Sequence, residues 1–264
     1  MRVLNRVAGA FLSVFAIAAP GRTQAPSASA KASAPVDLTG YWVSLITEDW
    51  RYRMVTPAKG DYASLPISAE GRRIADTWDL ARDEAAGNQC KAFGVGGIMR
   101  MPTRLRIAWQ DENALKVEAD AGTQTRVLRF GGAVSGEVEA TWQGRSAAQW
   151  VFASVRGGPT QFTANSLIPG EASRPPSGAL KVVITRMRAG YLRKNGVPYS
   201  ENAVITEYFD RLGPEPNGDV LLVVRTTVED SKYLTQPFVT STHFKLERDG
   251  SKWNPMPCKV DPPR

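Results

Sequence analysis

One histidine, His243, carries the only imidazole in this chain of 264 residues. Histidine-based zinc sites and metal dyads draw on several such ligands, so we expect no metal centre. Phe244 and Leu246 alternate with His243 along a predicted strand and take its buried face. His243 shares the other face with Ser241 and Lys245. The pattern therefore predicts a solvated histidine rather than a catalytic one.

Nucleophile and phosphate motifs are weak. The segment closest to a nucleophile elbow, GRSAA at residues 144–148, lacks the second glycine and lies between predicted strands. The glycine-rich segment GVGG at residues 94–97 precedes no helix and lacks the lysine of a phosphate loop, so we interpret it as a flexible turn. We predict no catalytic residue and no cofactor from these patterns.

Carboxylates are frequent but show no paired pattern. Glu207 and Asp210 are three residues apart on a predicted strand, which puts them on opposite faces. Two carboxylates could still meet across neighbouring strands, as in glycosidases. A hydrolase or isomerase that uses cross-strand carboxylates therefore stays an alternative.

Aromatic side chains are the strongest binding signal. Four of the seven tryptophans lie in or near predicted strands: Trp50, Trp109, Trp142 and Trp150. Aromatic residues that line a barrel can bind an apolar ligand or a sugar face. The alternative is that the same side chains fill the core. We predict these four as ligand-binding residues, with Trp109 as the leading candidate.

The elements that must position these residues are best defined at residues 104–130. Leu105, Ile107 and Trp109 alternate with Arg104, Arg106 and Gln110, and Leu115 and Val117 alternate with charged residues. This period of two predicts half-buried strands. A three-residue loop at 111–113 would pair Trp109 with Leu115 and Ile107 with Val117. The same register places an arginine, Arg106, opposite Glu118 on the other face.

A second three-residue loop at 120–122 predicts the next register. Gly122 would take the left-handed position of this loop. Ala119 would then pair with Thr123, and Leu115 with Val127.

Further strand patterns follow at residues 138–142, 147–155, 180–187, 203–212, 220–228 and 239–247, each bounded by turn residues. Residues 68–86 read as one or two short helices that begin at a Ser68 cap. Evenly spaced strands favour a barrel or sandwich. We predict an all-β fold, an antiparallel calycin-like barrel of about ten strands with a short helical insertion.

The N-terminus predicts export. Arg2 and Arg6 precede a short apolar run, so residues 1–19 read as a signal peptide. Residues 20–36 form a linker of Pro, Ala and Ser that we expect to be disordered. Residues 37–264 would be a single β-barrel domain, periplasmic or secreted, without a stable membrane span once the signal is removed. An uncleaved membrane anchor is the alternative.

The distribution of charge does not favour nucleic-acid binding. The formal net charge is +7. Four positively charged residues and no acidic residue lie before residue 37, so these four account for more than half of the excess. The remaining charges are interspersed without a basic run. Oligomeric state has no signal in the sequence.

Export permits oxidation of the two cysteines. We predict a disulfide between Cys90 and Cys258, which would enclose most of the domain. Two separate buried thiols are the alternative.

Gly40-Tyr41-Trp42 resembles the G-x-W of the first strand in lipocalins and related calycin barrels, where the Trp closes one end, often under a late-strand Arg. The resemblance implies structural roles for Gly40 and Trp42, with Lys245, Arg248 or Arg225 as the packing cation. The chain also resembles a group of exported bacterial β-barrel proteins of uncharacterised function. The matching text is residues 190–200, 206–209, 228–230, 233–238 and 253–255 with Cys258, together with 37–40 and 48–50.

That resemblance implies export, a lipocalin-like fold and no assigned catalytic residue. The leading hypothesis is a lipocalin-like protein that binds a small, largely apolar molecule. The alternatives are the carboxylate hydrolase or isomerase and a structural protein of the envelope.

Overall fold

A computed structural model describes residues 28–132, 139–152 and 178–264. The predicted signal peptide lies outside these residues, as does the first part of the linker. Within the described ranges no helix has the length and apolar character needed to cross a membrane.

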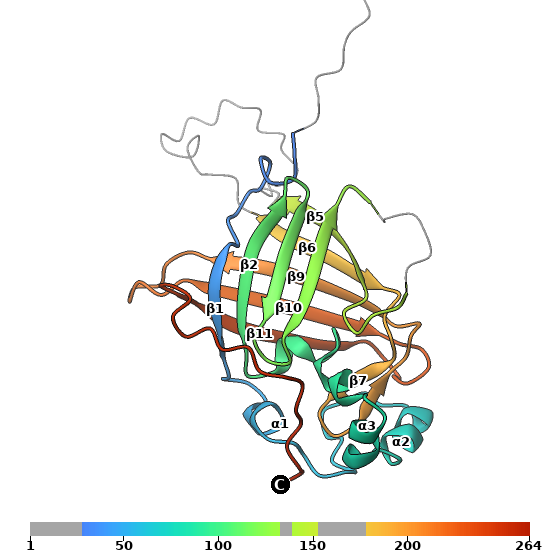
Figure 1. Cartoon of the computed structure of the whole chain (residues 1–264). Helices are drawn as coiled ribbons and strands as arrows, with labels where there is room; N and C mark the ends of the chain where they lie inside the picture. Colours follow the sequence, from blue (N-terminus) through green and yellow to red (C-terminus); the bar gives the residue numbers. More distant parts are fainter. Residues whose placement is uncertain (1–27, 133–138, 153–177) are drawn as a thin grey trace, which may run out of the picture.

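Nine strands close into a barrel in the order β1-β11-β10-β9-β6-β5-β4-β3-β2 (Figure 1). The all-β barrel is confirmed. Its strands are β1 Gly40–Leu45, β2 Arg104–Asp111, β3 Ala114–Ala119, β4 Gln124–Phe130, β5 Arg145–Phe152, β6 Gly178–Thr185, β9 Val204–Leu212, β10 Leu221–Glu229 and β11 Phe238–Glu247.

The barrel is mixed rather than purely antiparallel, which corrects our prediction. β4 and β5 run parallel, with Leu128 opposite Ser146, whereas the other neighbours are antiparallel. Residues 131–144 connect the two strands, and a connection of a dozen or more residues is what a parallel pair needs. The strand predicted at 138–142 is not formed in its described part, where Thr141 makes only an isolated bridge to Met187.

Short helices and a two-stranded ribbon gather at one end of the barrel, which we call the helical end (Figure 1). Ser68 caps α2 as predicted, its hydroxyl accepting from the Gly71 N–H at 3.0 Å. The elements are α1 Trp50–Met54, α2 Ala69–Ala75, α3 Leu80–Ala85, η1 Gln89–Phe93 and η2 Ile98–Arg100, with the ribbon β7 Gly190–Arg193 and β8 Val197–Tyr199.

The first hairpin has the predicted register. Ile107 pairs with Val117, Trp109 with Leu115 and Arg106 with Glu118. Leu105, Ile107, Leu115 and Val117 are buried in the core.

The second hairpin is one residue out of the predicted register. Ala119 pairs with Gln124 and Leu115 with Leu128. The reason is that Thr123 joins Gly122 in the left-handed region, at φ 50° and 72°, so the loop has one more residue than expected. A shift of one residue exchanges the two faces of a strand. Arg126 and Leu128 therefore point inward instead of Thr125 and Val127.

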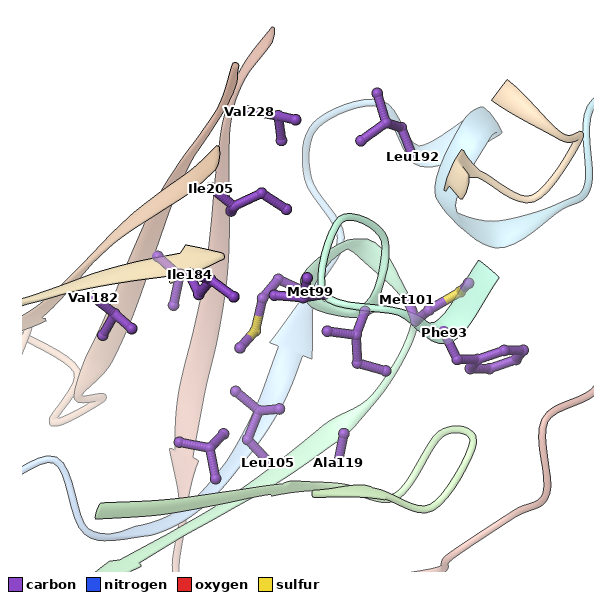
Figure 2. Packing of buried hydrophobic residues seen from close by; sticks show 14 of the residues in the cluster. Phe93, Met99, Met101, Leu105, Ala119, Val182, Ile184, Leu192, Ile205 and Val228 are labelled. Carbon is purple, nitrogen blue, oxygen red and sulfur yellow. The ribbon is translucent and has the colours of Figure 1, made fainter. Parts of the chain in front are cut away.

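Side chains fill the barrel interior. Residues from opposite walls, such as Leu105, Leu180 and Phe244, have no exposed surface. At the helical end, η2 contributes Met99, which Figure 2 shows among strand residues that include Ile184 and Ile205. The 3-10 helix η2, which directly precedes β2, therefore helps to close the helical end.

The opposite end, which we call the hairpin end, carries the turn between β2 and β3. Residues 28–36, expected in the disordered linker, have a defined place there, above β2 (Figure 1). The Ala30 N–H donates to Asn113 Oδ1 at 2.9 Å, and the Lys31 N–H donates to the Glu112 carbonyl at 3.1 Å. Ordered chain thus begins before residue 37 and covers this end of the barrel.

Candidate functional site

Two of the four predicted tryptophans meet at the hairpin end. Trp109 on β2 and Trp150 on β5 lie with Phe130 in one cluster, with ring centroids 5.3–6.4 Å apart. The Trp150 indole donates to the Ala30 carbonyl at 2.7 Å. This hydrogen bond fastens the N-terminal segment to the aromatic cluster.

The other two tryptophans lie elsewhere. Trp50 is in α1 with 64% of its surface exposed. Trp142 stacks under Arg188, whose guanidinium carbon is 3.9 Å from the ring centroid. The four residues that we predicted as one ligand-binding set therefore do not form one site.

Trp42 is fully buried, and its indole donates to the Leu38 carbonyl at 3.0 Å. The cation over its ring is Arg211 of β9, at 6.0 Å, rather than Lys245, Arg248 or Arg225. Strand alternation explains this outcome, because Arg211 continues the inward row of Glu207 and Phe209, whereas Arg225 and Lys245 fall on outward positions. Gly40, at φ 131°, lies where an added Cβ would be 2.9 Å from Leu246.

His243 faces outward, as its strand pattern predicted. Its side chain is 35% exposed, and Nδ1 lies 3.4 Å from the Glu48 carboxylate. Glu48 also pairs with the buried guanidinium of Arg53. The described residues contain no group of three or more His, Cys, Asp or Glu suited to a metal ion.

Four carboxylates are buried in the described ranges, and hydrogen-bond donors hold each of them. Glu207 pairs with Arg126 inside the barrel at 2.5 and 3.2 Å. Asp83 accepts from Lys91 and Tyr191, Asp120 from Thr103 and the Arg104 N–H, and Asp230 from Ser200 and the Lys232 N–H. Nothing in this arrangement favours the carboxylate hydrolase over a binding function.

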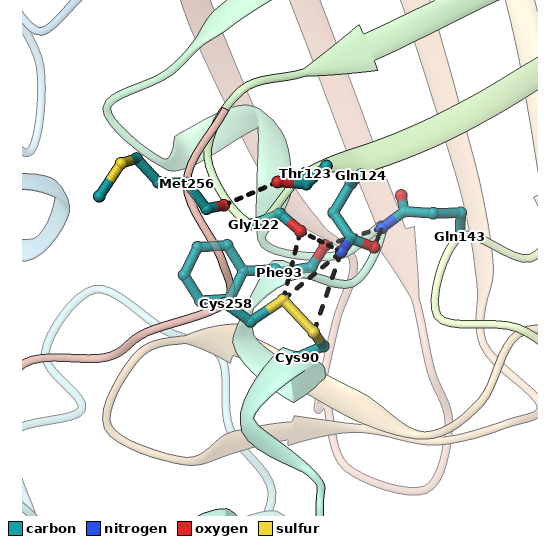
Figure 3. Close-up of a disulfide and its surroundings, with 8 residues drawn as sticks. All are labelled: Cys90, Phe93, Gly122, Thr123, Gln124, Gln143, Met256 and Cys258. Atoms are coloured by element: carbon teal, nitrogen blue, oxygen red, sulfur yellow. Dashed lines mark hydrogen bonds between the residues drawn. A yellow bond between two sulfur atoms is a disulfide. The ribbon is translucent and has the colours of Figure 1, made fainter. Parts of the chain in front are cut away.

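The predicted disulfide between Cys90 and Cys258 is present (Figure 3). Gln124 at the start of β4 donates to Cys258 Sγ at 3.4 Å and to the Gly122 carbonyl at 2.6 Å. Nearby, the Thr123 hydroxyl donates to the Met256 carbonyl at 3.0 Å. These contacts hold the C-terminal tail against the β3–β4 loop.

A cavity of about 380 Å³ opens between this tail and the barrel. We call it the methionine groove because Met54, Met101 and Met256 line it. Met54 and Met256 expose 53% and 54% of their surface, whereas Met101 is buried. The full lining is Met54, Phe93, Met101, Pro102, Arg104, Asp120, Ala121, Gly122, Lys194, Asn254, Met256, Pro257, Lys259 and Asp261.

The lining of the methionine groove also includes positively charged side chains. Lys194, Arg104 and Lys259 line the groove, with Asp120 and Asp261 as its acidic members. Burial lowers the pKa of Lys194, and the charge of Asp261 raises it by a smaller amount. The Lys194 ammonium donates to the Arg53 carbonyl at 2.9 Å. The groove can therefore take an apolar body with a polar or acidic end.

Sequence reasoning missed these methionines. They come from three places far apart in the chain, and isolated methionines have no periodicity that would mark a common surface. The only signal for the groove was the predicted disulfide, which fastens the tail near β3 and β4.

The chain matches no protein-family model, and comparison with curated proteins and with solved structures found no match. The resemblance to exported lipocalin-like proteins therefore stays a prediction.

Proposed function

We propose that this is an exported protein that binds a small, largely apolar molecule in the methionine groove. The groove carries the proposal because about 380 Å³ lies within the range of small-molecule pockets. Thioether side chains are flexible and polarisable and adapt to varied apolar partners. The two exposed methionines thus provide adaptable surface where a ligand would contact it.

The proposed position differs from the one that the sequence suggested. We expected the ligand inside the barrel beside Trp109. Side chains of the described residues fill the interior, and residues 28–36 are bonded to Trp150 and to the β2–β3 turn at the hairpin end. The proposal therefore assigns the ligand to the helical end, outside the barrel wall.

The disulfide supports the export that this proposal includes. Disulfides persist in oxidising compartments such as the periplasm or the extracellular space. We accordingly propose a periplasmic or secreted location, in which the protein would carry or sequester its ligand.

The first test is native mass spectrometry of the protein purified from its own periplasm or medium, which should detect a co-purifying apolar molecule. The second is a fluorescence titration with anilinonaphthalene sulfonate, an apolar probe with one anionic group. Met256→Gln and Met54→Gln keep the side-chain length and add no charge, and each should weaken probe binding by about tenfold, since each removes about 1–2 kcal/mol of apolar contact.

Val239→Gln is the matched control. Val239 is also apolar and 57% exposed, but it lies on β11 and is absent from the groove lining. This variant should bind the probe like wild type. Equal affinity of all variants, together with the absence of a co-purifying molecule, would leave a structural role in the envelope as the better account.

A further inference from the structure

Three arginines are buried together at the helical end. Arg53, Arg100 and Arg193 have 1%, 8% and 5% of their surface exposed. They line a small cavity of about 10 Å³, which we call the arginine pocket. Tyr52, Met101 and Lys194 also line it. A buried arginine normally has a carboxylate or several acceptors around it, so the charges at this pocket decide what it can hold.

The carboxylates paired here lie on the outer side of the cluster. Arg53 pairs with Glu48, and Arg100 pairs with Asp49 at 2.9 Å; the two carboxylate side chains are 32% and 40% exposed. Arg193 stacks on Tyr52 at 3.9 Å and donates to the carbonyls of Asp61 and Ala63 at 3.4 and 3.0 Å. The nearby Asp61 carboxylate pairs with Arg51 instead, at 2.8 Å.

The cluster therefore has more positive than negative charge. Lys194 adds a fourth cation, bound to the Arg53 carbonyl, with Asp261 as its more distant acidic neighbour. Burial, followed by the charge of Arg100, lowers the pKa of Arg193 to about 10. Burial also lowers the pKa of Arg53. The two lowered pKa values show that burial disfavours the charged forms of Arg193 and Arg53.

One buried donor of Arg53, a residue that lines the pocket, lacks a partner. Nη2 of Arg53 is buried and makes no hydrogen bond within the described residues, whereas Nε and Nη1 of the same side chain are bonded. A buried N–H without an acceptor costs more free energy than an ordinary hydrogen bond contributes. An occupant that accepts from Nη2 would remove this cost.

We infer that the arginine pocket binds one small anion of halide size. The cavity has room for a single water-sized particle. A water molecule would satisfy Nη2 but leave the excess positive charge, whereas a halide ion would accept the hydrogen bond and offset the charge. A carboxylate or phosphate group is too large for this volume.

This inference does not depend on the proposed function. The arginine pocket and the methionine groove share Met101 and Lys194 in their linings. The anion would lie behind the groove and hold together α1, η2 and β7, which contribute the three arginines.

The test is thermal unfolding of the full mature protein at constant ionic strength. Sodium gluconate is replaced stepwise by sodium chloride or sodium bromide. The Tm should rise with halide concentration, and the unfolding constant should fall about tenfold at ten times the dissociation constant. Phosphate at the same ionic strength should give no such rise.

Arg53→Lys keeps the positive charge but removes Nη2, so this variant should lose the halide dependence. Arg126→Lys is the matched control, because Arg126 is an equally buried arginine inside the barrel, paired with Glu207. It should lose stability but keep the halide dependence. If Arg53→Lys does not fold, crystals of the wild-type protein soaked in bromide should show an anomalous peak beside Arg53.

Three results would overturn the inference. The first is a Tm that does not respond to halide at constant ionic strength, with no bromide peak, which would assign the pocket to a water molecule. The second is a halide response that persists unchanged in Arg53→Lys, which would place the anion elsewhere. Equal stabilisation by phosphate would contradict the size of the proposed ion.

Discussion

Arg126 lies inside the barrel because one residue lengthens the loop before it. Sequence reasoning assigned the left-handed position to Gly122 alone, since a β-branched residue such as Thr123 rarely takes positive φ. Tertiary contact overrides that preference here, as Thr123 bonds to the C-terminal tail through its hydroxyl. The tail comes from residues more than a hundred positions away, so no local pattern could have predicted this register.

The Arg126–Glu207 pair should be strongly coupled. Both side chains are almost fully buried, and two hydrogen bonds join them. Glu207→Leu leaves a buried unpaired guanidinium, so we expect it to cost about 3–5 kcal/mol of unfolding free energy. The double variant Arg126→Met with Glu207→Leu should recover most of that loss, as measured by urea unfolding in a double-mutant cycle.

Glu118→Leu provides the surface control for this cycle. Glu118 pairs with Arg106 at 3.5 Å on the outer face, where the arginine side chain is 46% exposed. Loss of an exposed pair should cost less than about 1 kcal/mol. A Glu207→Leu variant as stable as Glu118→Leu would contradict the coupling.

At the level of elements, period-two alternation predicted the strands of the barrel well. It failed for β7 and β8, which are short and buried on both faces, so their residues do not alternate. It also placed a strand at 138–142, because apolar and polar residues alternate there, although in the described part Thr141 makes only an isolated bridge to Met187. Alternation of apolar and polar residues indicates a strand with one buried and one solvated face. It therefore predicts a strand only where one face meets water.

The segment at residues 94–97 is tightly packed rather than the flexible turn that its glycines suggested. All four residues are buried, and a Cβ on Gly96 would lie 2.6 Å from the Tyr199 ring. The glycines therefore allow close approach of the backbone to a fully buried tyrosine.

Gly96→Ala should destabilise the protein by about 1–3 kcal/mol, because an overpacked core must shift to admit the new methyl group. Gly213→Ala is the control, since a Cβ there meets nothing within 4 Å and the φ of Gly213 is not positive. Chemical unfolding of both variants measures the difference. Equal midpoints for the two would show that Tyr199 moves freely and that the packing at this segment is loose.

At the scale of the whole molecule, the sequence predicted a closed β structure but not which end carries the groove. The aromatic cluster at the hairpin end attracted the ligand hypothesis because tryptophans are recognisable in sequence. The groove at the helical end is assembled from α1, the segment that follows η2 and the C-terminal tail, which meet only after folding. Its residues therefore had no common pattern to detect.

The disulfide should control both stability and the groove. Cys90 and Cys258 are 168 residues apart, and the tail that Cys258 fastens supplies one wall of the groove. Loss of the bond removes a constraint on the unfolded chain worth up to about 5 kcal/mol in the loop-entropy treatment. Cys90→Ser and Cys258→Ser remove the same bond, so they should lower the unfolding free energy by similar amounts.

Both cysteine variants should also weaken binding of the anilinonaphthalene sulfonate probe, because the tail no longer holds Met256 beside the β3–β4 loop. Met256→Gln separates the two effects, since it changes the groove and leaves the disulfide intact. It should lose probe affinity while the midpoint of urea unfolding stays close to wild type. Cysteine variants that lose stability but retain full probe affinity would show that the backbone bond from the Met256 N–H to the Asp120 carbonyl, at 2.8 Å, is enough to hold the wall in place.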